Sequence, residues 1–193
     1  MKNNQLIPGE PLREGVDLIA DKKTGALIVV GSSAKLDKIS SGGINLSNCK
    51  FTPEMLCELA KMDGAIIVDE NVDTILKANV HLNPSDLIET SQTGTRHRTA
   101  QRVSVETELD VIAVSDESGI IKVFSNNEVN ELEESSMILG RVNESLQSID
   151  RTRRRFDDAL IELGELEIEN SITNQQVLEL SLIHISEPTR RPI

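Results

Sequence analysis

The sequence predicts an α/β fold in which helices flank a mixed central sheet, followed by the beginning of an α-helical region. Two short runs, Ala26–Val30 and Ala65–Val68, contain only apolar residues and follow a glycine, which is typical of strands buried on both faces. Segments with helical spacing alternate with these runs without the regular repeat of βαβ units, which favours a mixed sheet. From about Asn127 onward the composition becomes acidic and the spacing helical.

Three further elements are predicted in the first part of the chain. Residues 12–20 have the spacing of an amphipathic helix. Residues 40–48 are rich in Ser, Gly and Asn and should form a turn; their Gly-Gly pair lacks the Lys-Ser/Thr of a phosphate-binding loop. Thr52 followed by Pro53 predicts the N-terminus of a helix, whose apolar face contains Met55, Leu56, Leu59 and Ala60.

The next part of the chain predicts a turn, three strands and a helix. Residues 69–71 should turn the chain, and residues 76–82 alternate apolar and polar, which is the period of a half-buried strand. A helix is expected near residues 99–109. Residues 111–114 and 120–124 are expected to form a strand hairpin.

Composition excludes several classes of function. The 193 residues carry a formal net charge of −12, so the chain as a whole is not drawn to nucleic acid or to anionic lipid. It contains no Trp or Tyr, so the stacking platforms of single-strand-binding proteins are missing. Cys49 and Cys57 have no metal-ligand spacing and are expected to be idle thiols in a reducing cytoplasm. The sequence has no signal peptide and no apolar run of ~18 residues, so a cytoplasmic protein without membrane contact is expected.

The segment Thr93-Gly94-Thr95-Arg96-His97-Arg98-Thr99-Ala100 is the strongest candidate for a binding site. Arg96 and Arg98 can each donate several hydrogen bonds to phosphate oxygens. Gly94 allows close approach of the backbone, and the N-terminus of the following helix offers free N–H groups to an anion. These features indicate a loop that binds a polyphosphate, although an arginine-rich loop can also be solvated surface.

Two motifs resemble the signatures of the diadenylate cyclase family. Gly94-Thr95-Arg96-His97-Arg98 is one, and Asp63-Gly64-Ala65 is the other. Further segments similar to the DNA-scanning branch of that family are Pro11-Leu12-Arg13-Glu14-Gly15, residues 24–31, and residues 51–53 through 61–65. The resemblance covers roughly residues 5–180.

The resemblance implies an enzyme that condenses two ATP molecules into cyclic di-AMP and two pyrophosphates. It places Asp63 beside the 3′-hydroxyl and a Mg²⁺ or Mn²⁺ ion. It also implies that Arg96 and Arg98 hold the phosphates and stabilise the charge that builds on the departing pyrophosphate. Gly64 would lie where a side chain collides with the nucleotide. The implied ATP-binding residues are Gly64, Leu82, Thr95, Arg96, His97, Arg98 and Thr99.

Two of these residues have ordinary alternatives. Asp63 could simply be a turn residue between a helix and a strand, and the arginine segment is what favours the functional interpretation. His97 lies between two arginines, whose positive charge should keep its imidazole neutral at pH 7, so a role in holding a phosphate or the loop is favoured over a general base.

The resemblance also implies a domain organisation. Residues 1–128 should form the diadenylate cyclase domain and residues 129–180 the start of the helical linker domain. The seam of that helix contains Leu139, Val142, Leu146, Ile149, Phe156, Leu160 and Leu163. Residues 181–193 resemble the translation of a sequencing adapter and are expected to be non-native.

The expected partners follow from the same resemblance. ATP is the substrate, the chains should pair face to face because cyclic di-AMP has twofold symmetry, and the DNA-scanning branch assembles as an octamer. DNA would be bound only through a C-terminal domain that this sequence lacks. The four arginines within residues 151–155 are surrounded by acidic residues, which favours ion pairs along a helix over DNA contact. The alternatives are a nucleotide-binding regulatory or oligomerisation module without turnover, and a DNA-binding checkpoint protein in the intact parent.

Overall fold

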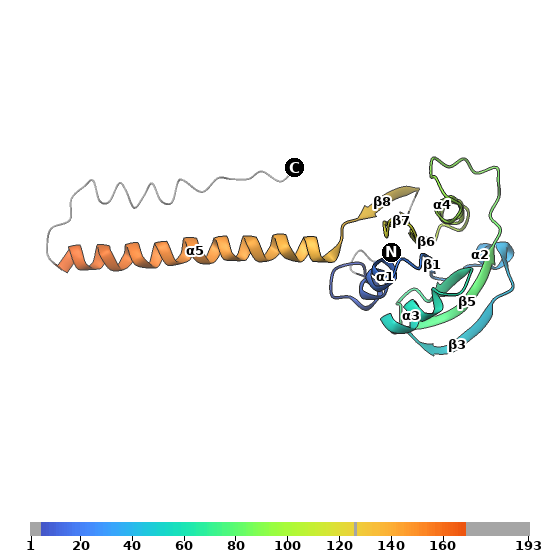
Figure 1. Ribbon diagram of the computed structural model, residues 1–193, viewed down its shortest axis with the longest axis horizontal. Coiled ribbons are helices and arrows are strands. Elements are labelled where there is room, and N and C mark those ends of the chain that lie inside the picture. The colour runs from blue at the N-terminus through green and yellow to red at the C-terminus, as the bar shows by residue number, and fades with distance from the viewer. Residues whose placement is uncertain (1–4, 126, 169–193) are drawn as a thin grey trace. The chain divides into compact units, whose positions relative to one another are not determined.

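A computed structural model describes residues 5–125 and 127–168 of the chain, which divides into two compact units, residues 1–138 and residues 139–193. The first unit is the α/β fold that the sequence predicts, with helices on both faces of a sheet (Figure 1). The tail expected to be non-native, residues 181–193, lies outside the described residues.

The sheet contains eight strands and is mixed. The pair β1 and β4 is parallel, and the other pairs are antiparallel. The order is β2-β5-β4-β1-β6-β7-β8, with β3 also paired to β5. The strands are β1 (Ala26–Val30), β2 (Ser40–Ser41), β3 (Ile44–Lys50), β4 (Ala65–Val68), β5 (Thr74–Leu82), β6 (Asp110–Val114), β7 (Ile121–Ser125) and β8 (Glu128–Leu132).

The centre of the sheet is β1, between β4 and β6. All of its side chains are buried, and they alternate between two cores: Ile28 belongs to one cluster and Leu27 and Val29 to the other. Because successive side chains of a strand point to opposite faces, an entirely apolar run is required where both faces are covered. The two buried runs in the sequence are therefore the two parallel strands β1 and β4.

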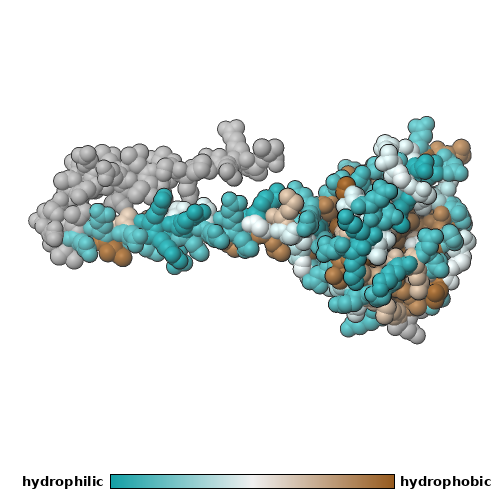
Figure 2. Space-filling model, viewed as in Figure 1, coloured by the Kyte–Doolittle hydropathy of each residue, from teal (hydrophilic) through white to brown (hydrophobic). Residues whose placement is uncertain are grey.

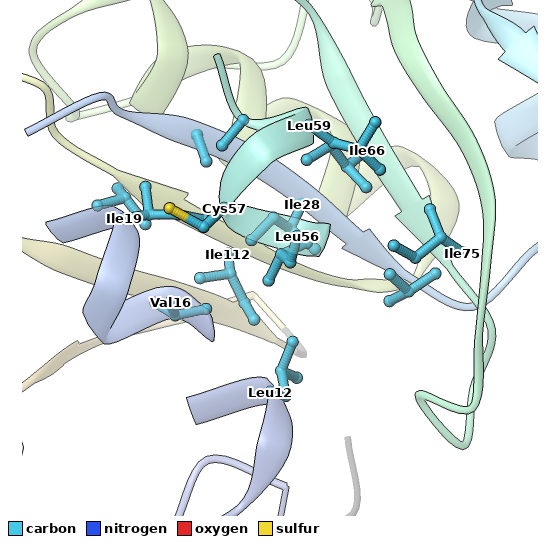
Figure 3. Packing of buried hydrophobic residues seen from close by; sticks show 14 of the residues in the cluster. Leu12, Val16, Ile19, Ile28, Leu56, Cys57, Leu59, Ile66, Ile75 and Ile112 are labelled. Carbon is cyan, nitrogen blue, oxygen red and sulfur yellow. The ribbon is translucent and has the colours of Figure 1, made fainter. Parts of the chain in front are cut away.

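Within the described residues, four helices cover the two faces of the sheet. On one face, α1 (Pro11–Asp21) and α3 (Pro53–Leu59) contribute Leu12 and Leu56 to the first cluster (Figure 3). On the other face, α2 (Ala34–Ile39) and α4 (Thr95–Thr107) contribute Leu36 and Val103 to the second. The predicted start of α3 is confirmed, because the Thr52 hydroxyl accepts a hydrogen bond of 3.2 Å from the N–H of Met55.

Two sequence-based expectations are wrong in part. Residues 40–48 were expected to be a turn, but only Gly42 and Gly43 turn the chain, and β2 and β3 flank them. The helical region was expected from about Asn127, but β8 comes first and pairs with β7. Val129 and Leu132 have the three-residue spacing of a helix, whereas in β8 they point to opposite faces and pack against different clusters. These three strands, β2, β3 and β8, have few apolar residues, so their period is weak.

The helix α5 (Ser135–Ile168) follows β8 and contains 34 residues. Its predicted seam is helical, but apart from the half-buried Leu163 the apolar side chains of this seam are solvent-exposed in the structure, with Leu139 52% exposed and Ile149 62% (Figure 2). The Arg153 guanidinium lies 3.9 Å from the Asp157 carboxylate, as expected for ion pairs along a helix. No helix within residues 5–125 and 127–168 is long and apolar enough to cross a membrane.

A buried arginine takes part in hydrogen bonds that connect α1 to the residues at the start of α5. Arg13 is 1% exposed; its Nε donates to the Asp17 carboxylate at 2.9 Å and its Nη2 donates to the carbonyl of Glu133. The Ser135 hydroxyl donates to the same Asp17 carboxylate at 2.5 Å. A buried guanidinium is tolerated because its donors are satisfied by an ion pair and a carbonyl. We call these four residues the Arg13 cluster.

Candidate active site

A cleft of about 820 Å³ opens on the face of the sheet that α4 covers. Its walls come from the turn before β4, the end of β5, the beginning of α4 and the turn between β6 and β7. The two motifs noted in the sequence therefore meet in one cavity. The lining residues are Leu27, Asp63, Gly64, Ala65, Val80, His81, Leu82, Thr93, Gly94, Thr95, Arg96, His97, Thr99, Ser115, Asp116, Glu117, Ser118, Ile120 and Lys122.

Asp63 and Gly64 form the wall at the start of β4. Asp63 is exposed in the cleft, and its carboxylate has no hydrogen-bond or ion-pair partner among the described residues. Gly64 has φ +117°, and a Cβ added there would lie 2.9 Å from the carbonyl carbon of Asn79 and 3.0 Å from its Cα. Glycine is thus required at this position by the chain itself, and a collision with a nucleotide stays a prediction.

The arginine segment is the first turn of a helix, which corrects the expectation of a loop with a helix near residue 99. The helix α4 begins at Thr95, and the N–H of Arg98 donates to the carbonyl of Gly94 at 3.1 Å. Gly94 is the N-cap residue with φ +83°, a conformation that only glycine adopts readily, and this lets the helix start directly after the turn. No side chain caps this helix, so the N–H groups of its first turn are open to an anion at the edge of the cleft.

Arg96 lies against the sheet in a slot that a glycine leaves open. A Cβ added at Gly25 would lie 2.7 Å from the Arg96 Nη1 and 3.0 Å from the Asp116 Cβ. The Arg96 Nη1 is 3.4 Å from the Asp116 carboxylate, which extends from the β6–β7 turn. Arg98 is exposed and is not among the lining residues, because side chains two positions apart on a helix point in different directions. Its role stays a prediction.

His97 is half-buried beside these charges. Burial lowers the pKa of its imidazole, and the positive charges of Lys122 and then Arg96 lower it further, partly opposed by the Asp116 carboxylate. The direction agrees with the neutral imidazole expected from the sequence. The causes differ from those expected, because burial contributes most and Lys122 takes the place of Arg98.

The other predicted ATP-binding residues all reach the cleft. Leu82, at the end of β5, lines it beside Leu27, Ala65 and Val80. Together these four side chains form an apolar floor on this side of the cleft. Thr95 and Thr99 lie on the α4 side, where their hydroxyls can donate to an anion.

The loop between β5 and α4 is fastened to α4 by side chains. The N–H of Ser85 donates to the Glu106 carboxylate at 2.8 Å, and the Arg102 Nε donates to the carbonyl of Ile88 at 3.1 Å. The Thr90 hydroxyl donates to the side-chain oxygen of Gln101 at 2.5 Å. These bonds hold the loop against α4, whose first turn lines the cleft.

The residues that line the cleft include a carboxylate that could contribute to a divalent metal site. Within the described residues no group of three His, Cys, Asp or Glu side chains could hold a metal ion. Asp63 nevertheless offers an unpaired carboxylate in the cleft, which is the hard oxygen ligand that Mg²⁺ and Mn²⁺ prefer. Mg²⁺ is commonly held by one or two carboxylates plus substrate phosphates, so one carboxylate fits this mode.

Three residues of the site were missed in the sequence. Asp116 lies in the β6–β7 turn, and the composition of that turn does not indicate that Asp116 lines a binding site. Lys122 interrupts the apolar run of β7, a signal that was present but is also common in edge strands. In the sequence Gly25 indicates only the boundary of a strand, whereas in the structure it makes room for Arg96.

Comparison with protein families matches both parts of the chain. Residues 13–129 match the family described as DisA bacterial checkpoint controller nucleotide-binding. Residues 132–187 match the DisA bacterial checkpoint controller linker region. The linker match includes residues 181–187, which belong to the tail of residues 181–193 that was predicted to be non-native. The non-native origin of that tail stays a prediction.

Curated relatives match over most of this chain. The DNA integrity scanning protein DisA of Kineococcus radiotolerans is 46% identical over 172 residues, which cover 89% of this chain and 48% of the relative. The DNA integrity scanning protein DisA of Carboxydothermus hydrogenoformans is 42% identical over 166 residues, 86% of this chain and 47% of that protein. The chain thus spans about half the length of the curated relatives it matches.

Solved structures share the fold. The crystal structure of a double mutant of DacA from Staphylococcus aureus has a TM-score of 0.52 at 27% identity, covering 68% of this chain and 89% of that one. A hypothetical membrane spanning protein from Bacillus cereus has a TM-score of 0.55 at 24% identity, covering 63% of this chain and 61% of that chain, which shows likeness of fold alone.

Proposed function

The chain belongs to the DisA family of bacterial checkpoint controllers, and on that premise we propose that its cleft condenses two ATP molecules into cyclic di-AMP with release of two pyrophosphates. One observation carries the proposal. The Asp63-Gly64-Ala65 turn and the uncapped first turn of α4, far apart in the sequence, line the same cavity. An apolar floor for a base lies beside them.

The residues have distinct roles in the proposed reaction. The 3′-hydroxyl oxygen of each nucleotide attacks the α-phosphorus of the other, and the bond from that phosphorus to the pyrophosphate oxygen breaks. The first turn of α4 and Arg96 hold the phosphates and stabilise the negative charge that builds on the pyrophosphate. Asp63 orients the attacking hydroxyl and would hold a Mg²⁺ or Mn²⁺ ion, which supplies further neutralisation of phosphate charge when bound. His97 stays neutral and holds the phosphate-binding turn.

The test is product formation by the purified chain. The chain is incubated with ATP and Mg²⁺ or Mn²⁺, and cyclic di-AMP is sought by mass spectrometry. Asp63→Asn should retain less than about a tenth of the wild-type rate, because such groups contribute 10²–10⁴-fold. Asp73→Asn, in an exposed turn outside the cleft, is the matched control and should be unaffected. ATP binding without product would instead indicate a nucleotide-binding module.

We further propose that the active form is a face-to-face pair of chains. Each chain carries one copy of each motif, and the two motifs line one cleft, whereas closing cyclic di-AMP requires two nucleotides whose 3′-hydroxyls face each other's α-phosphates. Activity per chain should therefore fall when dilution separates the chains. Constant activity per chain in a sample shown to be monomeric by mass photometry would contradict the pairing.

The octamer of the DNA-scanning branch and a cytoplasmic site of action belong to the same proposal. DNA is not proposed as a ligand of this chain, because its net charge of −12 opposes binding to a polyanion. A salt-dependent shift of branched DNA by the purified chain would contradict that statement.

A further inference from the structure

The cleft contains a second positively charged side chain besides Arg96, and it comes from the sheet rather than from α4. We propose that Lys122 binds the phosphate chain of the nucleotide. The inference rests on the proposed function, since it names a further ligand-binding residue of the same cleft.

Lys122 is placed at the cleft by its position in β7. It pairs with Ala113 of the buried strand β6 and lines the cavity, half-buried. Its Nζ donates to the side-chain oxygen of Gln92 at 3.1 Å, two residues before Gly94. The ammonium group therefore lies between the sheet and the segment that leads into the first turn of α4.

No acid neutralises the charge of Lys122 in the part of the chain that the structure describes. Among the described residues, Lys122 has no carboxylate within ion-pair distance, and its bonding partner is a neutral amide. Three other lysines, all outside the cleft, pair with acids: Lys35 with Glu108, Lys61 with Glu58, and Lys77 with Asp37. Lys122 is half-buried in the cleft, whereas the remaining described lysines without an acidic partner are exposed and lie outside it: Lys22, Lys23, Lys38 and Lys50. A phosphate bound in the cleft would supply the counter-charge of Lys122.

The β6–β7 turn brings two acids to the cleft, Asp116 and Glu117, and neither forms an ion pair with Lys122. Asp116 pairs with Arg96 at 3.4 Å. The lowered pKa of His97, to which Lys122 contributes more than Arg96, supports a position of the ammonium close to the first turn of α4. Two cations and a helix N-terminus thus converge on one region from different elements. An ammonium acts there as a point charge that binds phosphate oxygens in several orientations.

The experiment measures binding without turnover. The probe is 3′-deoxy-ATP, which lacks the attacking hydroxyl, titrated calorimetrically into the full chain. Lys122→Gln should weaken its binding on the order of tenfold, the scale of one hydrogen bond to a charged group. Lys122→Arg should stay within about threefold of wild type, because the charge is retained. Lys77→Gln removes the same charge from a half-exposed strand position outside the cleft and should have no effect.

A structural role for Lys122 gives different results. Adenosine, which has no phosphate, should bind Lys122→Gln as it binds the wild type in an NMR titration. Equal loss of adenosine and 3′-deoxy-ATP binding would overturn the proposal, as would unchanged 3′-deoxy-ATP binding by Lys122→Gln. The proposed reaction is tested by a different measurement. If the wild type binds 3′-deoxy-ATP but makes no cyclic di-AMP from ATP, catalysis is refuted, while the binding data alone still decide the role of Lys122.

Discussion

Replacing Gly64 with alanine tests whether glycine is needed for the fold or for the nucleotide. At φ +117°, an alanine has an unfavourable backbone conformation that costs about 1–3 kcal/mol. Its Cβ would also lie 2.9 Å and 3.0 Å from backbone atoms of Asn79, and such overpacking typically costs about 1–3 kcal/mol. We expect a loss of about 3 kcal/mol in the free energy of unfolding, which lowers the Tm by roughly 10 °C.

The assay is thermal and urea unfolding followed by far-UV circular dichroism, since the chain contains no Trp or Tyr. Gly9→Ala is the control for backbone strain alone, because Gly9 has φ +97° and nothing within 4 Å of an added Cβ. The Tm of Gly64→Ala should fall below that of Gly9→Ala, and the difference measures the cost of the close contact between the new Cβ and Asn79. Adding Asn79→Gly to Gly64→Ala should restore little, because two of the three nearest atoms belong to the Asn79 backbone.

One result would refute this reasoning. If Gly64→Ala unfolds at the same temperature as the wild type and loses only ATP binding, the collision is with the nucleotide and not with Asn79. The stability argument would then be wrong at this position.

Three other changes test neighbouring parts of the cleft. Gly25→Ala should displace the Arg96 guanidinium, because its Nη1 would lie 2.7 Å from the new Cβ, and should therefore weaken ATP binding in calorimetry. A crystal structure of the variant with Arg96 unmoved would contradict the claim that Gly25 makes room for Arg96. Arg96→Ala should weaken ATP binding about tenfold in calorimetry. Arg98 is exposed and does not line the cleft of its own chain, so Arg98→Ala should bind ATP nearly as the wild type does. On the proposed pairing Arg98 acts on the nucleotide of the facing chain, and Arg98→Ala should therefore form less cyclic di-AMP. The pKa of His97 is lowered in the folded state, so as the pH falls below about 6.5 the unfolded chain binds a proton at this residue before the folded chain does. The stability that the neutral imidazole contributes at pH 7 is therefore lost as the pH falls toward the lower folded pKa. Urea unfolding at several pH values should show a smaller loss of stability for His97→Asn than for the wild type, and parallel profiles would be the contrary result.

The parts of the fold with strong local signals were predictable from the sequence. The apolar runs of β1 and β4 and the Thr52-Pro53 start of α3 depend on residues adjacent in the chain, so their pattern can be read directly. The sequence did not predict the short strand β2, the edge strand β3 or the terminal strand β8. Their pairing with β5 and β7 stabilises sequences that have little strand character of their own.

The candidate site was predictable only where the residues form a motif. Asp63 and Arg96 could be named from the sequence, and the structure brings both to one cleft. Asp116, Lys122 and Gly25 could not, because their roles arise from contacts between distant segments. The start of α4 at Thr95 depends on the positive φ of Gly94, and a glycine before a polar segment equally predicts a longer loop.

The Arg13 cluster has a consequence for the order in which the chain folds during synthesis. Arg13 and Asp17 can pair as soon as α1 forms, but their remaining partners lie 120 and 118 residues further along the chain. Until the segment around Ser135 has left the ribosome, the guanidinium that will be buried lacks its hydrogen bond to the carbonyl of Glu133. Domains generally fold as units during translation, so α1 should dock stably only after β8 has been made. A stalled nascent chain that ends before residue 133 should therefore leave the first helix open to protease, although every residue of that helix was synthesised first.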